Sequence, residues 1–226
     1  MTEVSDPYLY RIVPFRHLID LFESKELHFA PSSAWEDPYE RILQHKSTNW
    51  TFAQCWCRRA VSDAMWRIYS PDRTAVRIRT SRSKQIQLGS RINASHHCTF
   101  RLGEVTYLPA RAVDAEMDRI AGLLKKRFDA KLALDAQFMK RDAFDFEAEV
   151  RAIVYLKAQS RSQPQSAFRF RFDPHAFIES ILFDPRADAT YVKVVAHYLK
   201  SVLKYEGTIG RSALYRAEPI HIPDEA

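Results

Sequence analysis

The stretch FEAEVRAIV, residues 146–154, decides the fold class because it alternates charged and apolar side chains with the period of a β-strand. That period places Glu147, Glu149 and Arg151 on one face and small apolar residues on the other. A strand with one apolar face packs that face on a core and pairs with neighbours along its edges. The stretch therefore predicts a half-buried strand inside a sheet.

Further strands and helices surround this one. The patterns predict strands at 8–13, 27–30, 50–56, 75–79, 100–108, 147–157, 168–172, 178–183 and 212–222. They predict helices at 14–24, 62–69, 81–88, 112–130 and 191–202, and a long hairpin connection at 160–166. No regular βαβ alternation and no Gly-rich βα turn is present, which argues against a doubly wound nucleotide-binding fold. We predict one α+β domain, residues 1–226, with a curved, mostly antiparallel or split sheet flanked by helices.

Bulk composition indicates a soluble cytoplasmic protein. The chain has 226 residues, 46% of them hydrophobic, which is enough for a sizeable core. No stretch approaches the ~20 apolar residues of a membrane span, and the N-terminus lacks the layout of a secretory signal. Three cysteines without disulfide spacing fit a reducing compartment. We therefore expect no membrane partner.

The cysteines and the known catalytic motifs exclude several classes of site. Cys55 and Cys57 would share one face of a strand, but no second Cys pair accompanies them, so the spacing favours buried small side chains over zinc. We predict no metal. No Gly-rich phosphate loop, HExxH helix or GxSxG elbow is present, which excludes P-loop, zinc-protease and α/β-hydrolase readings.

A modest basic surplus permits an anionic partner. The net charge is +6 and the pI is near 9.2. Arg77 and Arg79 alternate with apolar residues, and Arg169 and Arg171 alternate with phenylalanines. Such strands can stack bases and contact phosphates of a nucleotide or nucleic acid, or they can form a solvated or half-buried sheet face.

The acidic strand is the first candidate for chemistry. Carboxylates two residues apart raise each other's proton affinity, while Arg151 lowers the pKa of the nearer one. Glu147 and Glu149 could therefore hold a negative charge beside a developing cation, or bind a pair of hydroxyl groups. The alternative is a solvent-facing strand with an internal salt bridge, which would contribute little.

Two further clusters could bind a ligand. Trp66 and Tyr69 on one helix could form an aromatic wall for a base or a nicotinamide, although such residues are often core. Arg11 could reach a phosphate from the first strand, with Tyr10 on the opposite face, although a simple surface position is the alternative.

Five segments taken in order resemble one bacterial family. They are residues 10–13, 35–40, 55–57, 65–69 and 146–151. Together they are similar to the family catalogued as domain of unknown function 2971, over residues 8 to 215. The segment 35–40 contains Asp37 and Glu40, which we predict to be substrate-binding or structural residues.

A second and looser resemblance is to the ADP-ribosyltransferase superfamily. It implies that Glu149 is the catalytic carboxylate, Glu147 orients the acceptor, Arg11 with Tyr10 holds the phosphates of NAD, and Tyr69 with Trp66 stacks the nicotinamide. The superfamily's Ser-Thr-Ser strand has no counterpart here. The resemblance implies an NAD-dependent transferase with a role in phage defence or as a toxin.

Two alternatives remain open from the residues. One is a non-enzymatic nucleotide or nucleic-acid binding module that uses the four arginines named above. The other is a metal-dependent nuclease, for which the carboxylates would be Asp37, Glu40, Glu147 and Glu149.

Overall fold

Strand β3 (Thr51–Cys57) organises the main sheet, because strands pair along both of its edges. Strand β8 (Glu149–Leu156) pairs antiparallel with the whole of β3 on one edge. On the other edge, β2 (Glu26–Pro31) pairs with the first half of β3, and β1 (Tyr8–Val13) pairs only where Tyr10 faces Cys57. The sheet therefore splits at β3 into two branches.

The computed structural model describes residues 6–157 and 165–218. Its remaining strands are β4 (Val76–Ser81), β5 (Cys98–Glu104), β6 (Thr106–Leu108), β7 (Met139–Arg141), β9 (Phe168–Arg171), β10 (Ser180–Phe183) and β11 (Thr208–Arg211). Its α-helices are α1 (Phe15–Ser24), α2 (Asp63–Tyr69), α3 (Arg82–Ser95), α4 (Ala110–Lys126), α5 (Ala130–Asp135), α6 (Pro174–Phe177) and α7 (Ala189–Ser201).

The two branches extend in different directions from β3. One branch continues from β1 through β4 and β10 to β11, and the other continues from β2 to β9. Strand β5 pairs with the free edge of β8. Every pairing in this sheet is antiparallel except β10 with β11, and the separate pair β6 and β7 is parallel. The predicted fold class, an α+β structure with a mostly antiparallel, split sheet, is confirmed.

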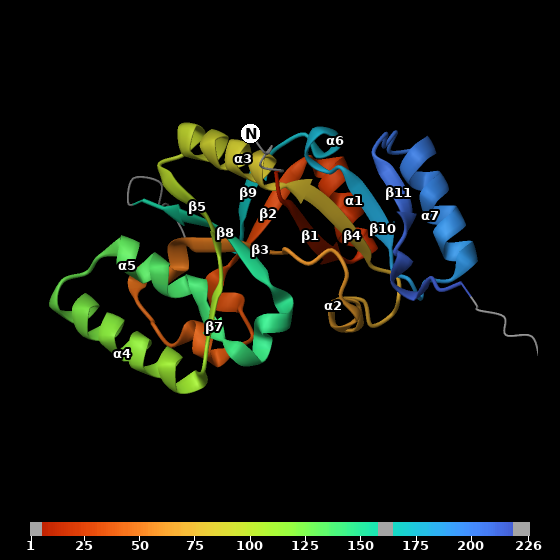
Figure 1. The fold of residues 1–226 in the computed structure, drawn as a ribbon. Helices are drawn as coiled ribbons and strands as arrows, with labels where there is room; N and C mark the ends of the chain where they lie inside the picture. The colour runs from red at the N-terminus through yellow and green to blue at the C-terminus, as the bar shows by residue number, and fades with distance from the viewer. Residues whose placement is uncertain (1–5, 158–164, 219–226) are drawn as a thin grey trace, which may run out of the picture.

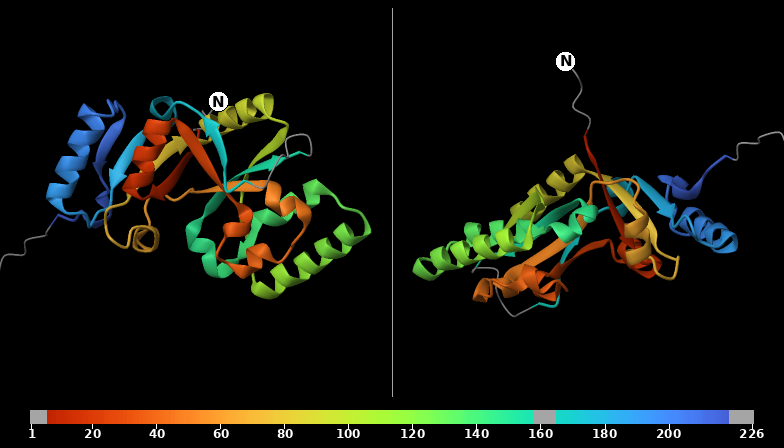
Figure 2. Two further views of the ribbon diagram at one scale, coloured as in Figure 1. Left: turned by 180° about the vertical axis from the view of Figure 1, so that it is seen from behind. Right: turned by 60° about the horizontal axis from the view of Figure 1, so that its bottom comes forward.

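The helices lie at both ends and on the faces of this sheet (Figures 1 and 2). Helix α7 covers β11 at one end of the molecule, and α4 and α5 lie at the opposite end with β7. Helix α2 packs against β1, close to the point where the sheet splits. The arrangement brings α2, β1, β3 and β8 together near the middle of the molecule.

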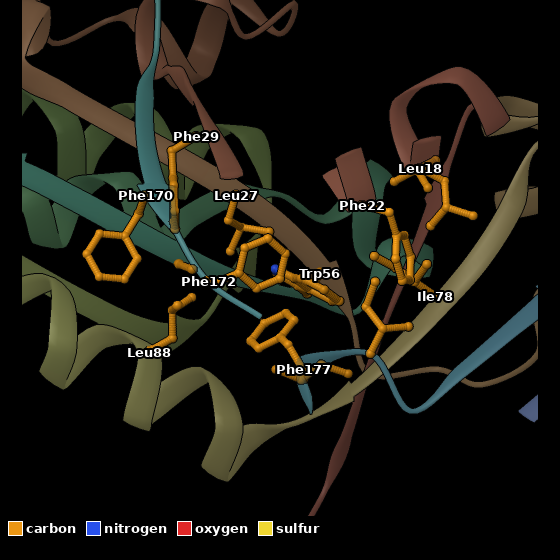
Figure 3. Close-up of a cluster of buried hydrophobic side chains, with 14 of the residues drawn as sticks. Leu18, Phe22, Leu27, Phe29, Trp56, Ile78, Leu88, Phe170, Phe172 and Phe177 are labelled. Carbon is orange, nitrogen blue, oxygen red and sulfur yellow. The ribbon is translucent and has the colours of Figure 1, made fainter. Parts of the chain in front are cut away.

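The core fills the space between the sheet and helices α1, α3 and α6 (Figure 3). Leu18 and Phe22 come from α1, Leu88 from α3 and Phe177 from α6, and they surround Trp56 of β3. On β8, the side chains of Val150, Ala152 and Val154 belong to the same cluster. The apolar face predicted for the 146–154 stretch is therefore the core face. Its charged face points the other way.

Short side chains set the ends of several helices. The Ser62 hydroxyl accepts a hydrogen bond from the Met65 backbone N–H at 3.3 Å, so α2 begins where the sequence predicts. Asp188 accepts bonds from two N–H groups at the start of α7. Lys25 adopts a left-handed conformation (φ 54°) that ends α1 and turns the chain into β2.

Two strand predictions need correction. The predicted 100–108 strand is broken at Val105 into β5, which pairs with β8, and β6, which pairs with β7 in a separate sheet. The closing strand lies at Thr208–Arg211 rather than 212–222, and a 3₁₀ turn follows at Ala213–Tyr215. Residues 158–164 and 219–226, parts of the predicted hairpin connection and closing strand, lie outside the described residues.

Candidate functional site

The acidic stretch is a strand only from Glu149 onward. Residues Asp142–Glu147 form a 3₁₀ segment, and Ala148 (φ 42°, ψ 51°) adopts a left-handed conformation before β8 begins. The prediction that Glu147 lies on the strand face by simple alternation is therefore wrong. The Glu147 carboxylate and the Glu149 carboxylate nevertheless both lie close to the Lys140 ammonium group.

Arg151 holds Glu149 in a bidentate pair. The guanidinium Nε lies 2.8 Å from one Glu149 oxygen, and Nη2 lies 2.9 Å from the other. Nη2 also pairs with Glu40, and Nη1 donates to the Gln137 carbonyl at 2.5 Å. The Trp35 ring packs 4.2 Å from the guanidinium carbon. With only 1% of its side chain exposed, Arg151 is a buried cation with its charge fully paired.

Lys140 joins the three carboxylates from the other side. Its Nζ lies 2.5 Å from Glu147, 3.7 Å from Glu149 and 3.8 Å from Glu40. Burial lowers the pKa of Lys140, but the three carboxylates raise it further, so the pKa lies above its usual value. Lys140 is therefore a fixed cation.

The cluster carries one negative charge in excess. Three carboxylates (Glu40, Glu147, Glu149) face two cations (Lys140, Arg151), which leaves 3 − 2 = 1 negative charge when all are ionised. Burial raises the pKa of Glu149, but Arg151 and Lys140 lower it by more, so Glu149 stays ionised. Burial raises the pKa of Glu40 above its usual value. The predicted effect of Arg151 on the nearer carboxylate is confirmed.

Two tyrosines and a cysteine border the cluster. The Tyr69 hydroxyl lies 3.5 Å from Glu147, while the residue is 43% exposed. The Tyr107 hydroxyl accepts the Glu149 backbone N–H at 2.8 Å. Burial, with the nearby carboxylates, raises the pKa of Tyr69, so its hydroxyl stays protonated. Burial also raises the pKa of the Cys55 thiol, which bonds to Glu149 as a neutral donor.

Arg11 is the cation of this region that lacks a partner. It is half-buried, and among residues 6–157 and 165–218 no hydrogen bond or ion pair holds its guanidinium. Burial lowers the pKa of Arg11, which lines a small surface hollow with Cys57 and Met65. Tyr10 turns away, and its ring packs 4.8 Å from the Arg77 guanidinium carbon.

Trp66 does not share the position of Tyr69. It is only 1% exposed and packs as a core residue of α2, while its backbone carbonyl accepts a bond from Arg186. Asp37 lies with Arg141 at 2.9 Å and caps the short turn that carries Glu40. The loop at 35–40 therefore delivers Glu40 to the cluster and leaves Asp37 at its margin.

The four arginines of the binding-module hypothesis lie in two places. Arg79 packs 4.2 Å from the Tyr8 ring and pairs with Glu179 at 3.5 Å, and Arg77 packs on Tyr10. Arg169 and Arg171 are exposed on β9. The phenylalanines that alternate with them face the core, so they are not available to stack bases.

Lys140, Tyr107 and Gln137 are site residues that the sequence did not indicate. Lys140 and Gln137 lie in a segment with no helix or strand pattern, and Tyr107 lies in the predicted 100–108 strand, but each meets Glu149 or Arg151 only through the fold. For the nuclease hypothesis, cations already pair with the four carboxylates: Arg141 pairs with Asp37, and Lys140 and Arg151 pair with Glu40, Glu147 and Glu149. Within the part of the chain that the structure describes, no group of His, Cys, Asp or Glu is arranged to hold a metal ion.

Comparison with solved structures finds a likeness to Thermus DarT. The structure titled "Thermus sp. 2.9 DarT in complex with NAD+" has 12% sequence identity and a TM-score of 0.43, and the match covers 93% of this chain and 98% of that chain. The complex with carba-NAD+ gives 12% and 0.44, covering 92% and 96%. The complex with ADP-ribosylated ssDNA gives 11% and 0.45, covering 94% and 97%. At this similarity the likeness assigns no role to any residue.

Other comparisons find no relative. No family model matches the sequence, so membership of the family of unknown function 2971 remains a prediction. No curated protein matches the sequence either. None of the helices in the described part of the chain is long and apolar enough to cross a membrane.

Proposed function

We propose that the protein transfers ADP-ribose from NAD⁺ to an acceptor and that Glu149 is the catalytic carboxylate. The observation that carries the proposal is the fixed, ionised Glu149, held by Arg151 in a buried cluster with one negative charge in excess. A fixed carboxylate stabilises a sugar cation as it develops, and it does so more strongly away from bulk water.

The charges around the cluster fit both ends of NAD⁺. The surplus negative charge lies beside Glu147 and Glu149 and suits the cationic nicotinamide-ribose. Arg11, which has no partner among the described residues, suits the phosphates. A ligand that carries a cation and phosphates together would satisfy both features, whereas a simple anion or a simple cation would satisfy only one.

Tyr69 is the aromatic residue placed for stacking. Its ring is exposed, while its hydroxyl reaches Glu147. Trp66 is buried behind it, so in this proposal Trp66 supports α2 and Tyr69 alone contacts the nicotinamide ring.

The carboxylates have lone pairs left for the reaction. An ionised carboxylate accepts about four hydrogen bonds; Arg151 occupies one position on each oxygen of Glu149, and the Cys55 thiol occupies a third. Glu149 then accepts a ribose hydroxyl and stabilises the positive charge that forms as the bond from ribose to nicotinamide breaks. The bonding electrons leave with nicotinamide. Glu147 orients the acceptor and takes its proton as the new bond to ribose forms.

Transfer of label from NAD⁺ tests the proposal. Wild-type protein incubated with NAD⁺ labelled in the adenylate group should modify a protein or nucleic acid in a cell extract. Glu149→Gln keeps the size of the side chain but removes the charge and replaces one acceptor oxygen with a donor NH2 group, and it should reduce labelling by about 100-fold or more. Exposed Glu206→Gln is the matched control and should label as the wild type does.

A role in phage defence or as a toxin remains part of the proposal. If it is right, expression of the wild type should slow growth of a bacterial host, and Glu149→Gln should restore growth. Slow growth with both forms would point to a cause other than transferase activity.

A further inference from the structure

The outer strand β9 carries a cationic surface away from the candidate site. We call this surface the basic edge and define it by four exposed residues: Lys25, Arg91, Arg169 and Arg171. Strand β9 ends one branch of the sheet and pairs only with β2 among the described strands. The basic edge thus follows a strand edge with which no described strand pairs.

The strand period explains why the arginines are exposed. Phe168 and Phe170 alternate with them and enter the core, so Arg169 and Arg171 must point outward. Residues two apart on a strand are separated by ~7 Å, which gives a regular repeat of positive charge along the edge.

Arg91 of α3 belongs to the basic edge because it contacts two residues of β9. Its Nη2 lies 3.5 Å from the Arg171 carbonyl, and its guanidinium packs 5.5 Å from the centre of the Phe170 ring. Two surface hollows meet at Arg91 and Arg171. One, of about 450 Å³, is also lined by Lys25 and His175, and the other, of about 580 Å³, is also lined by Arg169 and His96.

Little negative charge offsets these cations. Glu26 lies 3.6 Å from Arg169, and the Asp173 carboxylate accepts the His175 backbone N–H at 2.9 Å. Counting both acids, four cations face two anions, a surplus of 4 − 2 = 2 positive charges. Within residues 6–157 and 165–218, no carboxylate forms an ion pair with Lys25, Arg91 or Arg171.

We propose that the basic edge binds the sugar-phosphate backbone of a single-stranded nucleic acid. Repeated cations and two adjoining hollows fit a flexible chain of phosphates better than one compact anion. The phenylalanines of this strand are buried, so the contacts are to phosphate rather than to stacked bases. Binding is therefore insensitive to base sequence. Arg77 and Arg79 have no part in it, because they pack on tyrosines in the other branch of the sheet.

Fluorescence anisotropy with a labelled single strand of about 16 nucleotides tests the proposal. Arg169→Ala with Arg171→Ala should weaken binding at least tenfold and lower the salt dependence, the slope of log K against log salt, by about two. Lys125→Ala with Lys126→Ala removes the same charge from exposed positions on α4, and it should change the slope and the affinity little.

Three outcomes would overturn the proposal. These are equal binding by the β9 and α4 double variants, strong dependence on base sequence, and competition by polyglutamate as effective as by nucleic acid, which would indicate an acidic protein partner. Circular dichroism of the full chain shows whether the variants fold. Glu149→Gln should bind the labelled nucleic acid as the wild type does. A failure of the binding proposal therefore leaves the proposed transferase activity untouched, and loss of the transferase proposal leaves the binding proposal untouched.

Discussion

At the residue scale, Arg151 determines whether the acidic cluster can exist in a buried position. Its guanidinium pairs with Glu149 and Glu40 and bonds to the Gln137 carbonyl, and the Trp35 ring shields it from solvent. Removing one partner of a buried ion pair leaves a desolvated charge unpaired, which costs much more than losing an exposed pair. The stability of the protein should therefore depend on this single side chain.

Arg151→Met should lower the free energy of unfolding by about 3–5 kcal/mol, because Glu149 and Glu40 lose their main cation. Arg67→Met removes an exposed pair with Asp63 and is the matched control, with a much smaller expected cost because solvent screens an exposed pair. Urea denaturation of both variants measures the difference. Equal costs would show that the Arg151 pairing contributes no more than a surface salt bridge.

The ionisation of Glu149 should make stability depend on pH. Although burial alone raises its pKa, Arg151 and Lys140 lower that pKa below the ordinary 4.5. A carboxyl with a depressed folded pKa contributes stability above its unfolded pKa and loses that contribution as pH falls through the folded value. Glu40 has the opposite effect on stability. Because its pKa is raised in the folded state, ionisation of Glu40 lowers the stability of the fold as the pH rises.

The stability difference between wild type and Glu149→Gln should therefore be largest near neutral pH and shrink as the pH falls well below 4.5. Urea denaturation at a series of pH values measures this difference. A difference that stays constant over the series would mean that Glu149 does not titrate with a lowered pKa.

At the element scale, helix α2 carries Tyr69 to the cluster, and Ser62 sets where α2 begins. Ser62→Ala removes the acceptor for the Met65 N–H and should cost about 1 kcal/mol of stability. Ser33 is exposed and caps no helix, so Ser33→Ala should cost less than about 0.5 kcal/mol. Thermal unfolding compares the two, and an equal shift in Tm would argue against the cap.

Local pattern predicts most elements because their signals lie within a few residues. The bounds of β1, α1 and α2 follow from alternation, from Pro14 and from the Ser62 cap. The turn at Ala148 was not predictable, because alanine rarely adopts the left-handed conformation and only the surrounding contacts hold it there. Strand β7 has three residues, which is too short for a periodic pattern.

The candidate site was predictable only in part for a related reason. Glu149, Arg151 and Tyr69 stand in patterned segments, so the sequence indicates them. Lys140 and Tyr107 lie on the short parallel strands β7 and β6, and their approach to Glu149 depends on pairing between segments far apart in the chain. The pattern of residues within one segment does not predict such a pairing.

At the scale of the whole molecule, the split in the sheet places β1, which carries Arg11, and β8, which carries Glu149, on opposite edges of β3. Strand β1 touches β3 only where Tyr10 faces Cys57, and Cys57 in turn faces Glu149 on β8. Arg11, which has no partner among the described residues, and Glu149 of the negatively charged cluster thus come from strands on opposite edges of β3. The central claim is that one ligand, NAD⁺, contacts both.

Isothermal titration calorimetry of the wild type with NAD⁺ tests this claim most directly. We predict a Kd below the millimolar range and weakening of about tenfold or more in Arg11→Ala, because the phosphates lose their cation. Arg58→Ala, an exposed arginine paired with Glu104, should bind as the wild type does. Absence of binding at millimolar NAD⁺, or equal affinity of the Arg11 and Arg58 variants, would contradict it.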